Sequence, residues 1–201
     1  MKTWIFGYDL SLTAPACVAI PVGWRPGDWK AVRAFLIYPE APKADDVAGQ
    51  LRRYAEISNW ALRCLEETTQ MPFPHTKKHI AGIFIEQYAF SRNNAGAAKL
   101  MELGGIARIR LWDEADVLPH TVNTSQARVL LLGTLKGIAA GGQKIAVQRA
   151  LFDKGKAPRD WEENICDAFA VANWGLSEAG GVALILGEPS EPSSKKKRKA
   201  A

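Results

Sequence analysis

Two short apolar runs that each end in a carboxylate constrain this chain more than any other feature. Residues 3–9 read Thr-Trp-Ile-Phe-Gly-Tyr-Asp, and residues 80–86 read Ile-Ala-Gly-Ile-Phe-Ile-Glu. Each run has the length and apolar content of a buried strand. A carboxylate at the end of such a strand is costly to desolvate unless a cation or partner neutralises it. Asp9 and Glu86 are therefore candidate functional residues, against the alternatives of a turn-forming Asp and a solvent-facing edge Glu.

A third carboxylate, Asp167, lies inside an apolar helical pattern rather than on a polar face. Its neighbours are a cysteine, an alanine and a phenylalanine. Three carboxylates brought together repel one another unless a divalent metal lies between them. That constellation is how proteins build a metal-dependent site for phosphodiester cleavage. Asp9, Glu86 and Asp167 together predict a metal centre.

Length and composition suit one domain with a basic tail. The chain has 201 residues, 47% of them hydrophobic. We predict a folded domain at 1–186 and a disordered tail at 187–201, which contributes five basic and two acidic residues to a net charge of +5. The cluster at 195–199 resembles a nuclear-localisation signal, and it equally suits a flexible DNA-binding arm or an artificial extension.

Other compositional features exclude several classes of protein. No apolar stretch approaches the roughly 20 residues of a membrane helix, and no leader pattern predicts export. Cys17, Cys64 and Cys166 have no paired spacing, so we expect buried reduced thiols rather than disulfides or a zinc site. We therefore expect a cytoplasmic protein without a membrane partner.

Hydrophobic periodicity predicts a mixed α/β fold. Three meandering strands come first, and strands then alternate with helices, which indicates a mixed sheet covered by helices. Gly104-Gly105 reads as a helix stop and Ser125 as a helix cap. The expected strands are 3–9, 15–22, 31–38, 80–86, 106–112 and 117–122, and the expected helices are 45–69, 94–104, about 125–132, 143–152 and 159–176.

The three carboxylate-bearing stretches together resemble a known pattern. Ile85-Glu86-Gln87 is followed by an aromatic-containing loop, an Asn and a helix with Ala and Lys-Leu, over about fifteen residues at constant spacing. With Asp9 on the first strand and Asp167-Ala168 on the last helix, the chain resembles RuvC-type Holliday junction resolvases of the RNase H-like superfamily. The resemblance covers residues 3–176. It implies an RNase H-like fold and a bacterial or phage origin.

The resemblance also implies a function and a set of site residues. It implies an endonuclease that resolves four-way and other branched DNA as a homodimer, with two Mg²⁺ ions, or Mn²⁺ as a substitute, and no nucleotide cofactor. The segment 94–104 would lie in the dimer interface. The implied residues are Asp9, Glu86, Asp167 and Asn164 at the metals, and Arg128 and Lys144 on phosphates. Further candidates for DNA contact are Tyr88, Phe90, Arg92 and Asn93.

The pattern departs from the family at residue 164. Asn164 stands where such enzymes carry Asp or His, three positions before Asp167. Its amide oxygen offers a neutral metal ligand. Three readings stay open: Asn is natural here, Glu163 takes the ligand role, or the residue is an inactivating Asp→Asn substitution. Positions 163, 164 and 167 share one helical face by their three- and four-residue spacing.

Three other functions remain open from the sequence. One is a nuclease of the same fold that acts on flaps or forks. Another is a nucleotide-binding enzyme, because Asp9-Leu-Ser-Leu-Thr13 also resembles the phosphate loop of actin-like ATPases and sugar kinases, although Gly104-Gly105 and Gly141-Gly142 are poor nucleotide loops. The third is a junction-binding protein without catalysis, with Asn164 marking the lost activity.

Overall fold

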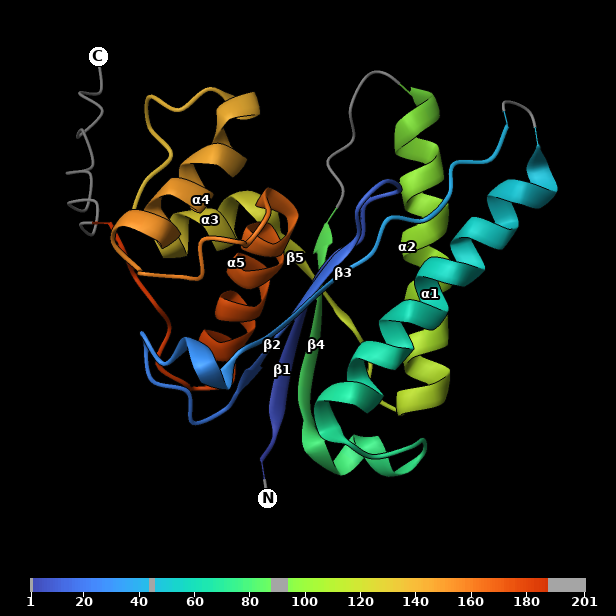
Figure 1. Cartoon of the computed structure of the whole chain (residues 1–201), viewed down its shortest axis with the longest axis horizontal. Helices are drawn as coiled ribbons and strands as arrows, with labels where there is room; N and C mark the ends of the chain where they lie inside the picture. The colour runs from blue at the N-terminus through green and yellow to red at the C-terminus, as the bar shows by residue number, and fades with distance from the viewer. Residues whose placement is uncertain (1, 44–45, 88–93, 188–201) are drawn as a thin grey trace, which may run out of the picture.

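The computed structural model describes residues 2–43, 46–87 and 94–187. They form one five-stranded sheet with helices on both faces (Figure 1). The strands are β1 (Trp4–Asp9), β2 (Ala16–Pro21), β3 (Arg33–Leu36), β4 (Ile80–Gln87) and β5 (His120–Asn123). The α-helices are α1 (Val47–Thr69), α2 (Asn94–Ala115), α3 (Thr124–Leu132), α4 (Gln143–Asp153) and α5 (Glu163–Glu178).

The sheet has the order β3-β2-β1-β4-β5. β1 pairs with β2, and β2 with β3, in antiparallel fashion, whereas β1–β4 and β4–β5 are parallel. The predicted fold class, three antiparallel strands followed by parallel ones, is therefore confirmed. Because β1 and β4 are parallel neighbours, their carboxyl ends reach the same edge of the sheet, as the prediction for Glu86 required.

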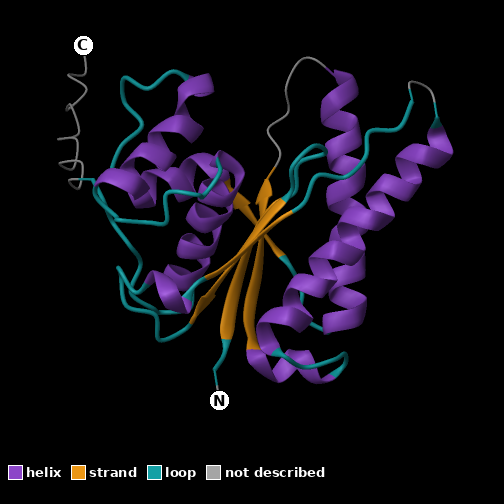
Figure 2. Cartoon of the chain, viewed as in Figure 1, coloured by secondary structure: helices purple, strands orange, loops and turns teal. Residues whose placement is uncertain are grey.

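Helices cover both faces of the sheet (Figure 2), and each face has its own core. On β1, Trp4, Phe6 and Tyr8 face α1 and α2, and Ile5 faces the opposite core beneath α3, α4 and α5. This strict alternation follows from the two-residue period of a strand. All three cysteines are buried and unpaired, as expected. Within the described ranges, no helix is both long and apolar enough to cross a bilayer.

The predicted strand at 106–112 is wrong, and so is the predicted stop at Gly104-Gly105. Helix α2 runs through both segments to Ala115. The apolar and basic residues at 106–112 alternate as in a strand, but the buried positions recur every four residues, which is a helical period. Those positions are Leu103, Ala107, Leu111 and Ala115.

Two helix starts also differ from the prediction. Asn123, not Ser125, caps α3: its Oδ1 accepts hydrogen bonds from the backbone N–H groups of Ser125 and Gln126 at 3.0 and 3.3 Å. Helix α5 begins at Glu163 rather than 159. The preceding residues form a turn closed by Trp161 N–H on the Pro158 carbonyl, and the Trp161 ring packs on Phe169 of α5.

Candidate metal centre

The three predicted carboxylates meet at one edge of the sheet. Asp9 ends β1, Glu86 is the penultimate residue of β4, and Asp167 lies in the second turn of α5. One carboxylate oxygen from each lies within 4.8 Å of the others. Asp9 and Asp167 are 3% and 1% exposed, and Glu86 is half-buried. Three converging carboxylates of this kind are the hard oxygen donors that Mg²⁺ and Mn²⁺ prefer, so the donor set fits divalent metal.

Gly7 explains how a helix comes close enough to complete the cluster. A Cβ atom built on Gly7 would lie 2.3 Å from the Ala172 backbone N and 2.4 Å from the Ala168 carbonyl oxygen. Only glycine permits this approach of α5 to β1. Gly7 and Asp9 are two residues apart and so point to the same face of the sheet. The same contact therefore brings Asp167, next to Ala168, beside Asp9.

Two cationic side chains enter the cluster from α3 and α4. Lys144 Nζ donates to Asp9 Oδ2 at 2.8 Å and lies 3.1 Å from Asp167 Oδ2. Arg128 donates two hydrogen bonds to the Asp167 carboxylate, from Nε to Oδ1 at 3.1 Å and from Nη2 to Oδ2 at 2.8 Å. Its Nη1 donates to Gln143 at 3.1 Å. Both cations were predicted to contact phosphates, and in the structure they are paired with the carboxylates.

Among the residues that the structure describes, no cation forms an ion pair with Glu86. Its Oε1 accepts a 2.6 Å hydrogen bond from Thr124 Oγ1. Burial, and then the charge of Asp9, raise the pKa of Glu86 to about 8. Burial also raises the pKa of Asp9, which Lys144 only partly offsets. Burial lowers the pKa of Lys144, but Asp9 and Asp167 outweigh burial and hold that pKa above its usual value. The cluster therefore favours one more unit of positive charge, held as a proton on Glu86 or supplied by a metal.

Asn164 lies at the cluster, while Glu163 does not. The Asn164 Oδ1 accepts a hydrogen bond from Lys144 Nζ at 3.0 Å, and its Nδ2 donates to the Ala14 carbonyl at 2.8 Å. Both ends of the amide are thus used, and an Asp at this position has no donor for Ala14. Glu163 is exposed on the surface of α5 and takes no part in the group of carboxylates.

Four of the predicted DNA contacts cannot be placed, and two residues that were not predicted lie at the site. Tyr88, Phe90, Arg92 and Asn93 lie outside the described residues. The sequence analysis missed Thr124 and Gln143. Thr124 follows β5, the parallel neighbour of β4, so its place after a parallel strand was a usable signal. Gln143 had none, because its role depends on the position of Arg128.

Comparisons of the whole chain give a likeness at the level of fold. No protein-family model matches the sequence, and no curated protein matches it either. Among solved structures, a Thermus thermophilus RuvC in complex with Holliday junction substrate matches with a TM-score of 0.58 at 16% identity, covering 89% of this chain and 96% of that one. A second T. thermophilus RuvC structure matches with a TM-score of 0.53 at 20% identity, covering 90% and 98%.

These matches define the class of fold in which the acidic cluster lies. The mixed sheet and its flanking helices form an RNase H-like fold, as the sequence predicted. Within that class, the arrangement is similar to RuvC over nearly the whole length of both chains.

Proposed function

We propose that this protein is a metal-dependent endonuclease that cleaves four-way and other branched DNA. The observation that carries the proposal is the convergence of Asp9, Glu86 and Asp167 within 4.8 Å at the carboxyl ends of two parallel strands. The likeness to a RuvC bound to a Holliday junction supports the choice of substrate. The actin-like alternative expects glycine-rich nucleotide loops, and Gly104-Gly105 lies inside helix α2 instead.

In this proposal each side chain has a defined role. Asp9, Glu86 and Asp167 would hold two Mg²⁺ ions, or Mn²⁺ in their place. Bound there, such ions would supply Lewis-acid activation of a water molecule and charge stabilisation for the leaving 3′ oxygen. Arg128 fixes the orientation of Asp167 through its bidentate hydrogen bonds to the carboxylate. Lys144 keeps Asp9 and Asp167 together and carries positive charge toward the phosphate that is cut.

A homodimer is part of the proposal because a four-way junction is two-fold symmetric. Paired cuts need two matched sites, which a two-fold dimer supplies. Helix α2 offers a surface for it: Met101, Ile109 and Trp112 are 48%, 58% and 52% exposed and recur at helical spacing. Large apolar side chains exposed together on one helix favour burial against a partner.

A panel of DNA substrates tests the proposal. The protein is incubated with a four-way junction, a fork, a flap and a linear duplex, with Mg²⁺, Mn²⁺ or EDTA. The expected result is metal-dependent cleavage of the junction into nicked duplexes, with little cleavage of the linear duplex. Preference for flaps or forks would assign the same fold a different substrate. Tight junction binding without cleavage in either metal would contradict the enzymatic part.

A further inference from the structure

A buried arginine that has no ion-pair partner among the described residues lies near the N-terminal end of α1. Arg53 is 8% exposed, and its Nε makes no hydrogen bond. Among the residues that the structure describes, no carboxylate forms an ion pair with Arg53; the neighbouring Arg52 faces Asp46 at 3.5 Å instead. A buried charge without a counter-charge lowers stability. A ligand that carries the opposite charge would offset that cost.

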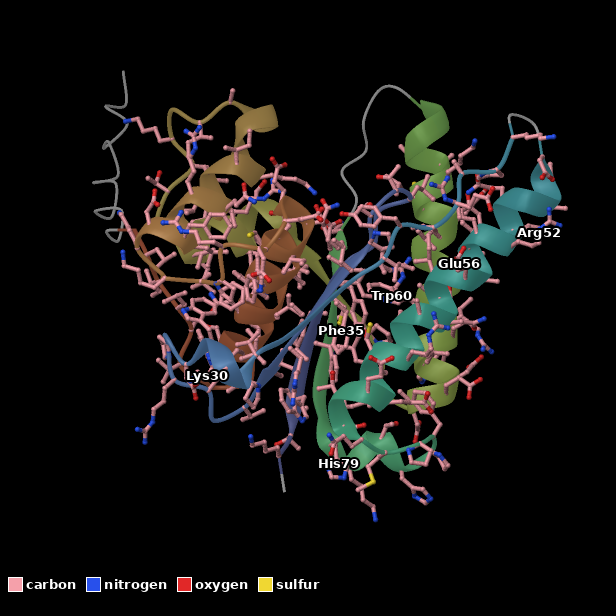
Figure 3. The ribbon with its side chains drawn as sticks, viewed as in Figure 1. Lys30, Phe35, Arg52, Glu56, Trp60 and His79 are labelled. Atoms are coloured by element: carbon pink, nitrogen blue, oxygen red, sulfur yellow. The ribbon has the colours of Figure 1, made fainter. Side chains whose placement is uncertain are left out.

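Arg53 lines an open pocket of about 470 Å³ between α1 and the segment 40–43. Figure 3 shows Arg52 near the outer end of α1 and Glu56 one turn further in. Lys43, Arg52 and Arg53 give this pocket three positive charges, and Glu40, Asp46 and Glu56 give it three negative ones. Asp46 is already engaged, because its Oδ1 accepts the Gly49 N–H at 2.7 Å and its Oδ2 faces Arg52. Arg53 therefore differs from Arg52 in having no ion pair among the described residues, and its buried Nε makes no hydrogen bond.

A second pocket, of about 420 Å³, continues this one toward α2. The two pockets share Lys43 and Asp46, and the second one reaches Lys99 in α2. Helix α2 is the next described element after β4, the strand that carries Glu86. The second pocket has Lys43 and Lys99 beside Asp46 and Glu102, so basic and acidic side chains are present in equal number from α2 to the start of α1.

We propose that the Arg53 pocket binds a phosphodiester group of a DNA arm. The inference rests on the proposed function, since it extends the DNA path from the acidic cluster to α1. A guanidinium offers several N–H donors in a plane and matches phosphate oxygens in pairs. Because the pocket is close to neutral overall, a single free phosphate binds it weakly, and the contact gains strength as one of several along a DNA backbone.

The test compares Arg53→Gln with a matched control, Arg63→Gln. Arg63 is exposed on the same helix and outside both pockets, so the control removes the same charge. Four-way junction affinity is measured in EDTA over a range of salt concentrations. We expect Arg53→Gln to reduce the slope of log affinity against log salt by about 0.9, the value for one phosphate contact. Arg63→Gln is expected to leave the slope unchanged.

A second measurement shows whether Arg53→Gln is still folded. It also distinguishes binding of free inorganic phosphate from binding of the DNA backbone. Thermal unfolding is followed with and without inorganic phosphate and a short duplex. We expect Arg53→Gln to unfold no earlier than the wild type, because it removes an unpaired buried charge, and the duplex to raise the wild-type Tm more than the variant's. An unchanged salt slope with intact junction cleavage would overturn the Arg53 site alone. Stabilisation by inorganic phosphate without any change in DNA binding would overturn the DNA assignment. Failure of the wild type to bind branched DNA would instead remove the proposed function.

Discussion

Arg128 donates a hydrogen bond to each carboxylate oxygen of Asp167, at 3.1 and 2.8 Å, and both side chains are nearly inaccessible to solvent. A buried charge pair of this kind contributes less than its geometry suggests, because both groups lose hydration. Removing one partner is costly, because the other is left buried and only partly compensated. Here Lys144, at 3.1 Å from Asp167, supplies that partial compensation.

Arg128→Met is therefore expected to lower the free energy of unfolding by about 3 kcal/mol, the lower end of the cost of breaking a buried pair. The double variant Arg128→Met/Asp167→Asn removes both charges, so it is expected to recover a large part of that loss. Urea unfolding of the wild type and the two variants measures both effects. A double variant as unstable as Arg128→Met would show that charge pairing is not the cause.

The raised pKa of Glu86 gives the metal-free protein a characteristic pH dependence. The folded state holds a proton on Glu86 up to a pKa of about 8, whereas the unfolded state loses it near 4.5. Between these values the folded state binds more protons, so stability declines as pH rises, by at most about 1.4 kcal/mol per pH unit from this group. Asp9, whose pKa is also raised, acts in the same direction.

Glu86→Gln removes the contribution of Glu86 to the pH dependence of stability, because glutamine does not titrate. We expect its stability in EDTA to decline less between pH 6 and pH 8 than that of the wild type, and measurement of unfolding by urea at each pH checks this. The exposed Glu178→Gln on α5 is the control and should follow the wild type. Parallel curves for the wild type and Glu86→Gln would contradict the protonated state of Glu86.

We expect the amide group of Asn164 to be the side chain that this site requires, rather than a replacement for an aspartate. Asn164→Asp removes the donor to the Ala14 carbonyl and places two acceptors together, which costs about 1–3 kcal/mol in the metal-free protein. We therefore expect lower stability and no gain in junction cleavage. A large gain in cleavage with Mg²⁺ would identify Asn164 as an inactivating replacement, so the rates of both proteins measured in parallel decide the question.

Gly7→Ala tests the approach of α5 to β1. The added methyl group meets backbone atoms of Ala168 and Ala172, which cannot move aside without shifting the helix. We expect a loss of about 1–3 kcal/mol in unfolding free energy, together with weaker cleavage, because Asp167 moves away from Asp9. Gly23→Ala is the control, since nothing lies within 4 Å of its Cβ position. Equal stability of the two variants would refute the role given to Gly7.

The exposed apolar side chains of α2 predict the site of dimerisation. Met101→Glu/Trp112→Glu is expected to sediment as a monomer at concentrations where the wild type is a dimer, because charge on this face opposes its burial. Val182→Glu changes an apolar residue that is 66% exposed and lies away from α2, so it should leave the dimer intact. A monomeric wild type, or a variant that still dimerises, would place the interface elsewhere or remove it.

The fold and the three carboxylates could be predicted from the sequence because they depend on local patterns. Apolar runs that end in Asp9 and Glu86 predict buried strands that each end in a carboxylate, and Asp167 lies in an apolar helical pattern. The segment 106–112 was misread because Arg108 and Arg110 alternate with apolar residues as they would in a strand, although its buried positions follow a helical period. The pairing of Lys144 with Asp9 joins residues 135 positions apart, and no local pattern reports such a contact.

Junction cleavage by single carboxylate variants tests the central claim most directly. Asp9→Asn, Glu86→Gln and Asp167→Asn are compared with the wild type and with Glu178→Gln, on a four-way junction with Mg²⁺. We expect each of the three variants to bind the junction but to cleave it much more slowly than the wild type. The loss of cleavage rate should exceed the roughly 10–100-fold effect of removing a residue that only hydrogen-bonds to a metal ligand. The control should cleave at the wild-type rate. Wild-type rates of cleavage in all three variants would contradict a metal centre built from Asp9, Glu86 and Asp167.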